Sequence, residues 1–196
     1  ELGQSPDKLG NKSFDLGNGH VRLDSSSQRL AKSEQILAKL SESDAGAAYL
    51  ASLQRVYGKQ RATVLVCAGD PHVSIYPNLQ IIGVHLRVVE PVAADRTIVN
   101  QYPATLAGVP AEVNAQRLRR HEWFFSPAGF GSPDDYEVFE RNQIGLAAQL
   151  DSRVILNRGM GHESRIGPDQ IQGAYTHEVT QRGQLIRWAE LMRAEP

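Results

Sequence analysis

The middle of the chain, residues 62–102, is a succession of short β-type segments separated by turn residues, and helical patterns flank it on both sides. Val84, Leu86 and Val88 alternate with other residues, which is typical of an antiparallel sheet with one face in water. The order of helices, then antiparallel strands, then helices predicts an α+β fold with helices on one sheet face. We expect strands at 62–67, 73–76, 79–83, 84–90 and 97–102, with a hairpin turn at 93–96.

Local patterns on either side of this region predict the remaining elements. Gly17-Asn18-Gly19 lies between apolar residues and predicts a β-hairpin over 14–23. Helical spacing over 33–57 predicts two helices, the second capped by Asp44 and ended by Gly58. Further helices are expected at 111–125, 133–150 and 180–192, with a short strand at 154–156.

The composition excludes several classes of function. The chain has 196 residues, 41% of them hydrophobic, and a formal net charge of -1, which suits one globular domain and gives no electrostatic case for binding nucleic acid or a membrane. No apolar run approaches a membrane span, and the start does not resemble a signal peptide. The single cysteine, Cys67, favours a cytoplasmic setting and a buried core thiol over a nucleophile.

The segment His121–Asp135 has two interpretations. Physically, it is two helical pieces with a break rich in Gly and Pro, and aromatic residues precede the break. Ser132 suits a helix N-cap, Pro133 the first helical position, and Asp135 the acidic position of a capping box. A plain helix start does not need the flanking Phe125-Ser-Pro-Ala-Gly-Phe130, however, so a functional motif is the second interpretation.

As a motif, Phe125 to Asp135 resembles the third-ligand region of the α subunits of aromatic ring-hydroxylating dioxygenases, which are Rieske, non-haem iron oxygenases. Other elements follow in family order from about Phe14 to the C-terminus. Gly17-Asn-Gly-His20 resembles the N-G-H turn of benzoate-type members, and Tyr76-Pro-Asn78, followed by Leu86 to Pro91, resembles two consecutive family strands.

The resemblance implies a curved antiparallel sheet with flanking helices, of the helix-grip or START-like type, incomplete at its N-terminus. Residues 1–196 would form the C-terminal part of the catalytic domain, without the Rieske domain. None of the six histidines matches the family's D-x-x-H-x-x-x-x-H ligand helix, and one cysteine cannot supply C-x-H and C-x-x-H. The ligand helix is expected to lie upstream of residue 1.

Site residues follow from the resemblance position by position. Asp135 would ligate iron, and Phe125 would line the substrate pocket. Asp70, His72 and Ile82 would occupy pocket positions on two strands that face the metal. Simpler interpretations remain open: Phe125 as core, His72 as a histidine at a strand edge, and Asp135 as a helix cap. We expect His121 at an exposed or interface position, and His162 and His177 in loops that touch a partner subunit.

The implied activity is O₂-dependent dihydroxylation or hydroxylation of an aromatic substrate, and aromatic carboxylates are the nearest match. Intact α subunits use Fe(II) and a [2Fe-2S] Rieske cluster. NAD(P)H supplies electrons through a reductase or ferredoxin, and the subunits form trimers, often with a β subunit. This chain alone should be inactive and bind iron weakly, because one carboxylate cannot hold it against water. The alternatives are a metal-free helix-grip module that binds small molecules and an interaction piece of a larger assembly.

Overall fold

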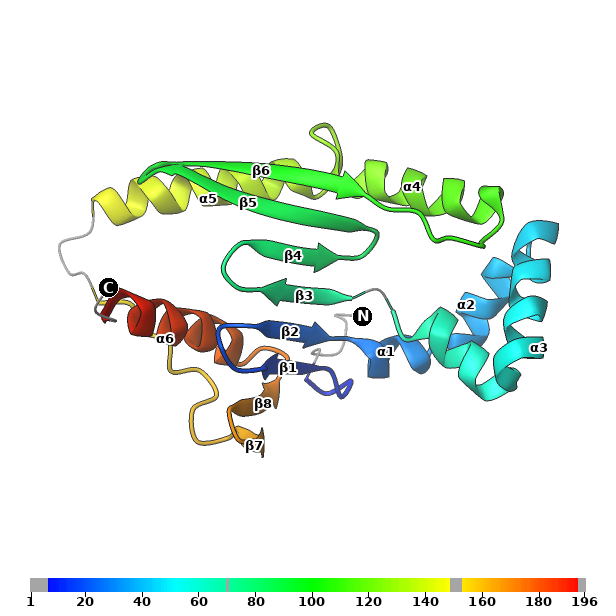
Figure 1. Cartoon of the computed structure of the whole chain (residues 1–196), viewed down its shortest axis with the longest axis horizontal. Coiled ribbons are helices and arrows are strands. Elements are labelled where there is room, and N and C mark those ends of the chain that lie inside the picture. Colours follow the sequence, from blue (N-terminus) through cyan, green and yellow to red (C-terminus); the bar gives the residue numbers. More distant parts are fainter. Residues whose placement is uncertain (1–6, 70, 149–152, 194–196) are drawn as a thin grey trace.

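A computed structural model describes residues 7–69, 71–148 and 153–193. One curved antiparallel sheet dominates the described part, with the strand order β6-β5-β4-β3-β2-β1-β8-β7 (Figure 1). The strands are β1 (Lys12–Asp15), β2 (Val21–Asp24), β3 (His72–Ile75), β4 (Leu79–Ile82), β5 (His85–Ala93), β6 (Arg96–Pro103), β7 (Ser164–Gly167) and β8 (Gln170–Ala174).

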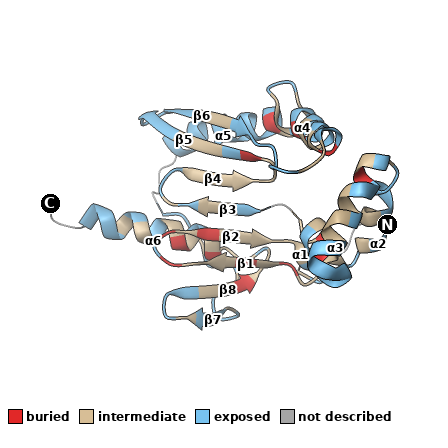
Figure 2. Ribbon diagram, turned by 45° about the vertical axis from the view of Figure 1, so that its right-hand side comes forward, coloured by how far each residue is buried: buried red, intermediate tan, exposed pale blue. Residues whose placement is uncertain are grey.

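Helices flank the sheet, so the predicted α+β class with a curved antiparallel sheet is confirmed. Three helices, α1, α2 and α3, gather at one end of the sheet, and α4 extends from β6 toward them, whereas α5 and α6 run along the sheet (Figures 1 and 2). Those helices are α1 (Ser26–Leu30), α2 (Ser33–Leu40), α3 (Asp44–Cys67), α4 (Ala111–Phe125), α5 (Ser132–Ala147) and α6 (Val179–Arg193).

Strand register shows that α5 and α6 contact the same sheet face. Ser74, Gln80, Arg87 and Gln101 are successive direct partners across β3, β4, β5 and β6, and such partners point to one face. On that face the Ser74 hydroxyl accepts a hydrogen bond from the side chain of α6 residue 184, and the Gln101 amide donates one to the tyrosine hydroxyl of α5 residue 136. We call this side the inner face.

The opposite, outer face carries apolar side chains that no described helix covers. Leu86 and Tyr102 are direct partners there, with 40% and 56% of their surface exposed. The alternation in 84–89 predicts a sheet with one face in water but does not say which face that is, since apolar residues occur on both. The structure buries His85 on the inner face and leaves Leu86 exposed on the outer face.

The predicted strand at 62–67 is wrong, because these residues are the last turns of α3. Ala62 and Cys67 are fully buried, and Arg29 donates a hydrogen bond from Nε to the Cys67 carbonyl. A short apolar run has no periodicity that separates a strand from a buried helix. Cys67 is a buried thiol, as predicted, and burial raises its pKa.

One further prediction about α3 needs correction, and another is confirmed. Ser43, not Asp44, is the N-cap residue, and its hydroxyl accepts a hydrogen bond from the Gly46 amide. Gly58 ends the first helical piece of α3, as predicted, because its φ of 75° and ψ of 160° are not helical and a second helical piece begins after it. Glycine adopts this backbone conformation without a side-chain clash, so the chain kinks there between two helical pieces.

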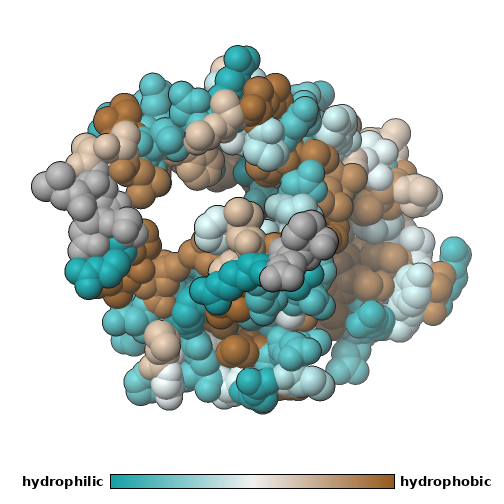
Figure 3. Space-filling model, turned by 60° about the vertical axis from the view of Figure 1, so that its left-hand side comes forward, coloured by the Kyte–Doolittle hydropathy of each residue, from teal (hydrophilic) through white to brown (hydrophobic). Residues whose placement is uncertain are grey.

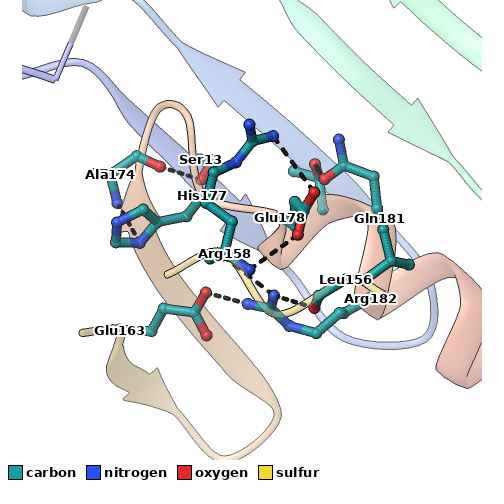
Figure 4. Close-up of polar contacts among 10 residues, drawn as sticks. Ser13, Leu156, Arg158, Glu163, Ala174, His177, Glu178, Gln181 and Arg182 are labelled. Carbon is teal, nitrogen blue, oxygen red and sulfur yellow. Dashed lines mark hydrogen bonds and ion pairs between the residues drawn. The ribbon is translucent and has the colours of Figure 1, made fainter. Parts of the chain in front are cut away.

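The segment after residue 153 contains no strand at 154–156, contrary to the prediction; the strands are β7 and β8. A polar cluster holds this segment against the start of α6 (Figure 4). Arg182 pairs with Glu163 and donates a hydrogen bond to the Leu156 carbonyl at 2.8 Å. The Arg158 amide donates to Glu178 at 2.9 Å. The predicted terminal helix 180–192 is confirmed as α6.

The two short motifs near the start of the sheet pack against each other. Gly17, Asn18 and Gly19 all have positive φ and form the β1–β2 turn, as predicted. His20 follows the turn, and its Nδ1 accepts a hydrogen bond from the Tyr76 amide at 3.1 Å. A Cβ atom on Gly19 would lie 2.8 Å from the Tyr76 ring, so close approach as well as turn geometry requires glycine.

None of the helices in the described ranges combines the length and the apolar character that crossing a bilayer requires.

Candidate functional site

Two of the predicted site residues lie side by side on the inner face. His72 at the start of β3 is the direct cross-strand partner of Ile82 at the end of β4. Ile82 is in turn the direct partner of His85, the first residue of β5. These three side chains therefore form a row that leads across the sheet toward α4.

The row ends at an aromatic cluster built around His85. This side chain is 1% exposed, and its ring centroid lies 4.6 Å from that of Phe125 and 4.8 Å from that of His121. Neither ring nitrogen of His85 has a hydrogen-bond partner among the described residues. Burial, with smaller contributions from the charges of His121 and Arg87, lowers the pKa of His85 to about 4. His85 is therefore a neutral ring near neutral pH.

A cleft of about 160 Å³ opens between this part of the sheet and α6. Both His72 and Ile82 line this cleft, and a hydrogen bond from Gln184 to Ser74 joins two other lining residues. Its lining combines apolar side chains with a larger number of polar ones, so it offers a small organic molecule both apolar contacts and hydrogen-bonding groups. The lining residues are Val21, Leu23, His72, Val73, Ser74, Gln80, Ile82, Thr180, Gln181 and Gln184.

A second inner-face row, next to the first, is polar. Arg87 of β5 lies directly between Gln80 of β4 and Gln101 of β6. The Arg87 Nε and the Gln101 Oε1 are both buried without a partner among the described residues. Burial is the first cause of the lowered pKa values of His72 and His85, and the Arg87 charge contributes to both.

The packing of the connection from α4 to α5 explains why aromatic residues and glycine occur in this motif. Trp123 and Phe130 stack in parallel with centroids 5.7 Å apart, and the Phe130 amide donates to the Trp123 carbonyl at 2.8 Å. A Cβ atom on Gly131 would lie 2.4 Å from the Phe124 ring, so only glycine fits there. This tight turn fixes the start of α5 beside the end of α4.

Asp135 lies in the first turn of α5, but it does not act as a cap. Gly131 is the N-cap residue, and no side chain makes a capping hydrogen bond at this helix start, contrary to the cap prediction for Ser132 and Asp135. The Ser132 hydroxyl instead donates to the Phe125 carbonyl at 3.0 Å. Asp135 is exposed, and its carboxylate has no hydrogen bond or ion pair in the described ranges. Those ranges also contain no group of three His, Cys, Asp or Glu side chains fit to hold a metal.

The structure thus brings together His72, Ile82 and, through His85, Phe125. Phe125 is half-buried at the end of α4, and Asp135 follows in the first turn of the next helix. The remaining predicted pocket position, residue 70, is Asp70, which lies outside the described residues.

Of the other histidines discussed from the sequence, only His121 lies beside these site residues. His121 is buried beside His85, contrary to the expectation of an exposed or interface position. His162 is exposed. His177 accepts a hydrogen bond from the Ala174 amide within its own β8–α6 turn.

Sequence reasoning missed three inner-face residues, His85, Arg87 and Gln101. The register of the β4–β5 hairpin would have identified them. In that register His85 lies opposite Ile82, Arg87 lies opposite Gln80, and Gln101 lies opposite Arg87 on the next strand.

The space-filling view shows an open hollow between the upper and lower parts of the molecule (Figure 3). Apolar side chains occur at its border.

Curated proteins with similar sequences are large subunits of dioxygenases. The chain is 38% identical over 98 residues to the 2-halobenzoate 1,2-dioxygenase large subunit of Burkholderia cepacia, a match covering 48% of this chain and 21% of that protein. It is 32% identical over 133 residues to the anthranilate 1,2-dioxygenase large subunit of Acinetobacter baylyi, covering 59% and 28%. The toluate 1,2-dioxygenase subunit alpha of Pseudomonas putida is 32% identical, covering 58% and 25%. The chain therefore matches under a third of each relative's length.

Solved structures show the same fold at lower identity. Naphthalene 1,2-dioxygenase with indole in its active site superimposes with a TM-score of 0.69 at 17% identity, over 96% of this chain and 43% of that one. A mutant of naphthalene 1,2-dioxygenase bound to phenanthrene gives 0.67 at 18% identity, over 94% and 42%. The Rhodococcus sp. enzyme bound to indole gives 0.60 at 16% identity, over 95% and 46%. No protein-family model matches the chain.

Proposed function

We propose that this chain, a relative of the large subunits of aromatic ring-hydroxylating dioxygenases, forms the substrate-facing, C-terminal part of the catalytic domain of such a subunit. The observation that carries the proposal is the grouping on the inner face. Ile82 and Phe125 adjoin the buried His85, His72 lies opposite Ile82 on β3, and Asp135 lies in the first turn of the helix that follows Phe125. Apolar and aromatic walls with few polar groups suit a flat aromatic ring.

Asp135 has the chemistry of an iron ligand. It is an exposed carboxylate whose oxygens have no partner in the described residues, so it is available to a metal. It offers one ligand, and a two-His, one-carboxylate site needs two histidines from elsewhere in the subunit. When bound, iron would supply O₂ activation for hydroxylation of the ring. Under this proposal, a Rieske cluster and a reductase outside this chain deliver electrons that originate from NAD(P)H.

The chain's own residues would bind and orient the ring. Phe125 and Ile82 would contact its faces and edges, and His72 would contribute a polar contact at the cleft. His85 is neutral and packed against Phe125, so it would hold that aromatic wall in place without adding charge. We propose an aromatic carboxylate as substrate, since the named relatives act on 2-halobenzoate, anthranilate and toluate. Trimers of large subunits, with a β subunit, would be the working assembly.

The test is Asp135→Asn in the complete subunit, with Asp134→Asn as the matched control. Both aspartates are exposed in the first turn of α5, so the two variants should unfold at similar temperatures. We expect D135N to lose iron and product formation, because an amide is a far weaker ligand than a carboxylate, and D134N to keep both. Iron retention with full activity in D135N would contradict the proposal. So would tight, stoichiometric iron binding by residues 1–196 alone.

A metal-free binding module is the second candidate, and the cleft next to His72 and Ile82 is the observation in its favour. Such a module would bind an aromatic ligand equally well with or without the carboxylate of Asp135. Unchanged ligand affinity in D135N, together with no iron in the unsubstituted subunit, would favour the module over the enzyme.

A further inference from the structure

Arg87 is an arginine with no counter-ion among the described residues. It lies in the middle of the inner face, between Gln80 and Gln101, and its Nε is buried without a partner in the same ranges. The half-buried Arg182, by contrast, pairs with Glu163. A partly desolvated guanidinium is costly unless an anion or an acceptor satisfies it, so the position of Arg87 calls for a ligand.

The nearest neighbours of Arg87 on the inner face of the sheet are two amides and a neutral ring. Its same-face neighbours are Gln80 and Gln101 on the adjoining strands and His85 two residues earlier on β5. The Arg87 charge helps to lower the pKa values of His72, His85 and His121, so the guanidinium lies close enough to act on all three rings. An anion entering the inner face would meet a favourable potential there.

Gln101 strengthens the case for a carboxylate. Its amide lies 2.9 Å from the Tyr136 hydroxyl, and its other polar atom is buried and unpartnered among the described residues. A hydroxyl both donates and accepts, so Tyr136 holds the amide equally well when its oxygen and nitrogen are exchanged. In that orientation the free atom is an NH₂ donor on the strand next to Arg87. Arginine and amide together would offer several donors to the two oxygens of a carboxylate.

We propose that Arg87, with Gln101 beside it, anchors the carboxylate of an aromatic acid whose ring lies toward Ile82 and Phe125. This inference rests on the proposed function and names the residue that selects its substrate class. Same-face neighbours along a strand lie about 7 Å apart. That spacing between the Arg87 and His85 positions matches the length of a benzoate-sized molecule. The carboxylate can therefore lie at the row of Arg87 while the ring lies at the row of His85.

A role as carboxylate anchor also explains why an arginine without a counter-ion among the described residues occupies this position. Without ligand, the half-desolvated charge works against folding, which is a common property of binding sites. Replacing Arg87 should therefore leave the free energy of unfolding of the ligand-free chain unchanged or raise it. An arginine that served the fold would show the opposite, a loss of stability on replacement.

The test measures binding of benzoate and of neutral benzamide to the full chain by calorimetry. The variants are Arg87→Gln, Arg87→Lys and the control Arg96→Gln, an exposed arginine on β6 of the same sheet. We expect R87Q to weaken benzoate binding by about 10- to 100-fold, the usual effect of losing a charge-assisted pair. R87K should give an intermediate loss, R96Q none, and benzamide affinity should change less than about two-fold throughout.

The outcomes separate the anchor from the proposed function. Equal losses for benzoate and benzamide in R87Q, or no loss for either, would overturn the anchor while aromatic binding itself stands. A lower free energy of unfolding in ligand-free R87Q would also overturn it, because Arg87 would then be a structural residue. If neither ligand binds the unsubstituted chain, the proposed function fails first, and the anchor fails with it.

Discussion

The buried His85 makes the stability of the fold depend on pH. Its pKa is about 4 in the folded chain, against an ordinary value of 6.5, because burial disfavours the imidazolium. Below pH 6.5 the unfolded chain therefore binds a proton that the folded chain refuses. Stability from this group is fully present above pH 6.5 and is lost as the pH falls toward 4. For that pair of values the loss is about 2 kcal/mol at about pH 5.

Urea unfolding of the unsubstituted chain and of His85→Phe, at about pH 8 and about pH 5, measures this contribution. The phenyl ring cannot titrate and suits the contacts with His121 and Phe125. We expect the drop in free energy of unfolding between the two pH values to be about 2 kcal/mol smaller in H85F than in the unsubstituted chain. The remaining drop would come from His121 and His72, whose pKa values burial also lowers.

His162→Phe is the matched control, because His162 is exposed and the same atoms change. The same change from imidazole to phenyl is thereby compared at a buried and at an exposed position. If the free energy of unfolding falls equally in H85F and H162F between the two pH values, the pKa of His85 is not lowered in the folded state. The reasoning from its burial and its unpartnered nitrogens would then be refuted.

Two further predictions concern stability. Arg182→Met should lower the free energy of unfolding by about 3 kcal/mol, because it leaves Glu163 and the Leu156 carbonyl without their partner in a mostly buried cluster. Arg187→Met, which breaks the more exposed pair with Glu190, should cost less than about 1 kcal/mol, and equal losses in urea unfolding would contradict this. Gly19→Ala should destabilise by at least about 1 kcal/mol more than Gly108→Ala. Both glycines have positive φ, but only Gly19 has the Tyr76 ring against it, so equal melting temperatures would refute the packing argument.

Turn chemistry made part of the fold predictable from sequence. Gly17-Asn18-Gly19 needs positive φ throughout and predicted the β1–β2 hairpin, and the helix predicted at 111–125 is α4. The strands β3 to β6 followed from runs of β-type residues with turns between them. The class of the fold followed from the order of these elements, which needs no knowledge of their packing.

Tertiary contacts decided the features that sequence did not predict. Residues 62–67 are helical because Ala62 and Cys67 bury themselves at the helical end of the molecule, which a continuous apolar run cannot reveal. The β7–β8 hairpin forms on the edge of β1, whose register pairs it with β8 from the far end of the chain. Such long-range pairing leaves little local signal.

The candidate site was predictable only through family resemblance, and then incompletely. His72, Ile82 and Phe125 were named from motifs, and the structure places them along one row of the inner face. His85, Arg87 and Gln101, which only the structure identifies, belong to no sequence motif. Their roles depend on which face of the sheet the helices cover. Alternation in β5 alone does not identify the inner face, because the apolar Leu86 and Val88 point to the outer face.

The measurement that tests the account most directly is a crystal structure of the chain with 2-bromobenzoate, in which anomalous scattering from bromine locates the ring. The account predicts bromine on the inner face, near Ile82 and Phe125, with the carboxylate toward Arg87. Bromine on the outer face, beside the exposed Leu86 and Tyr102, would contradict it.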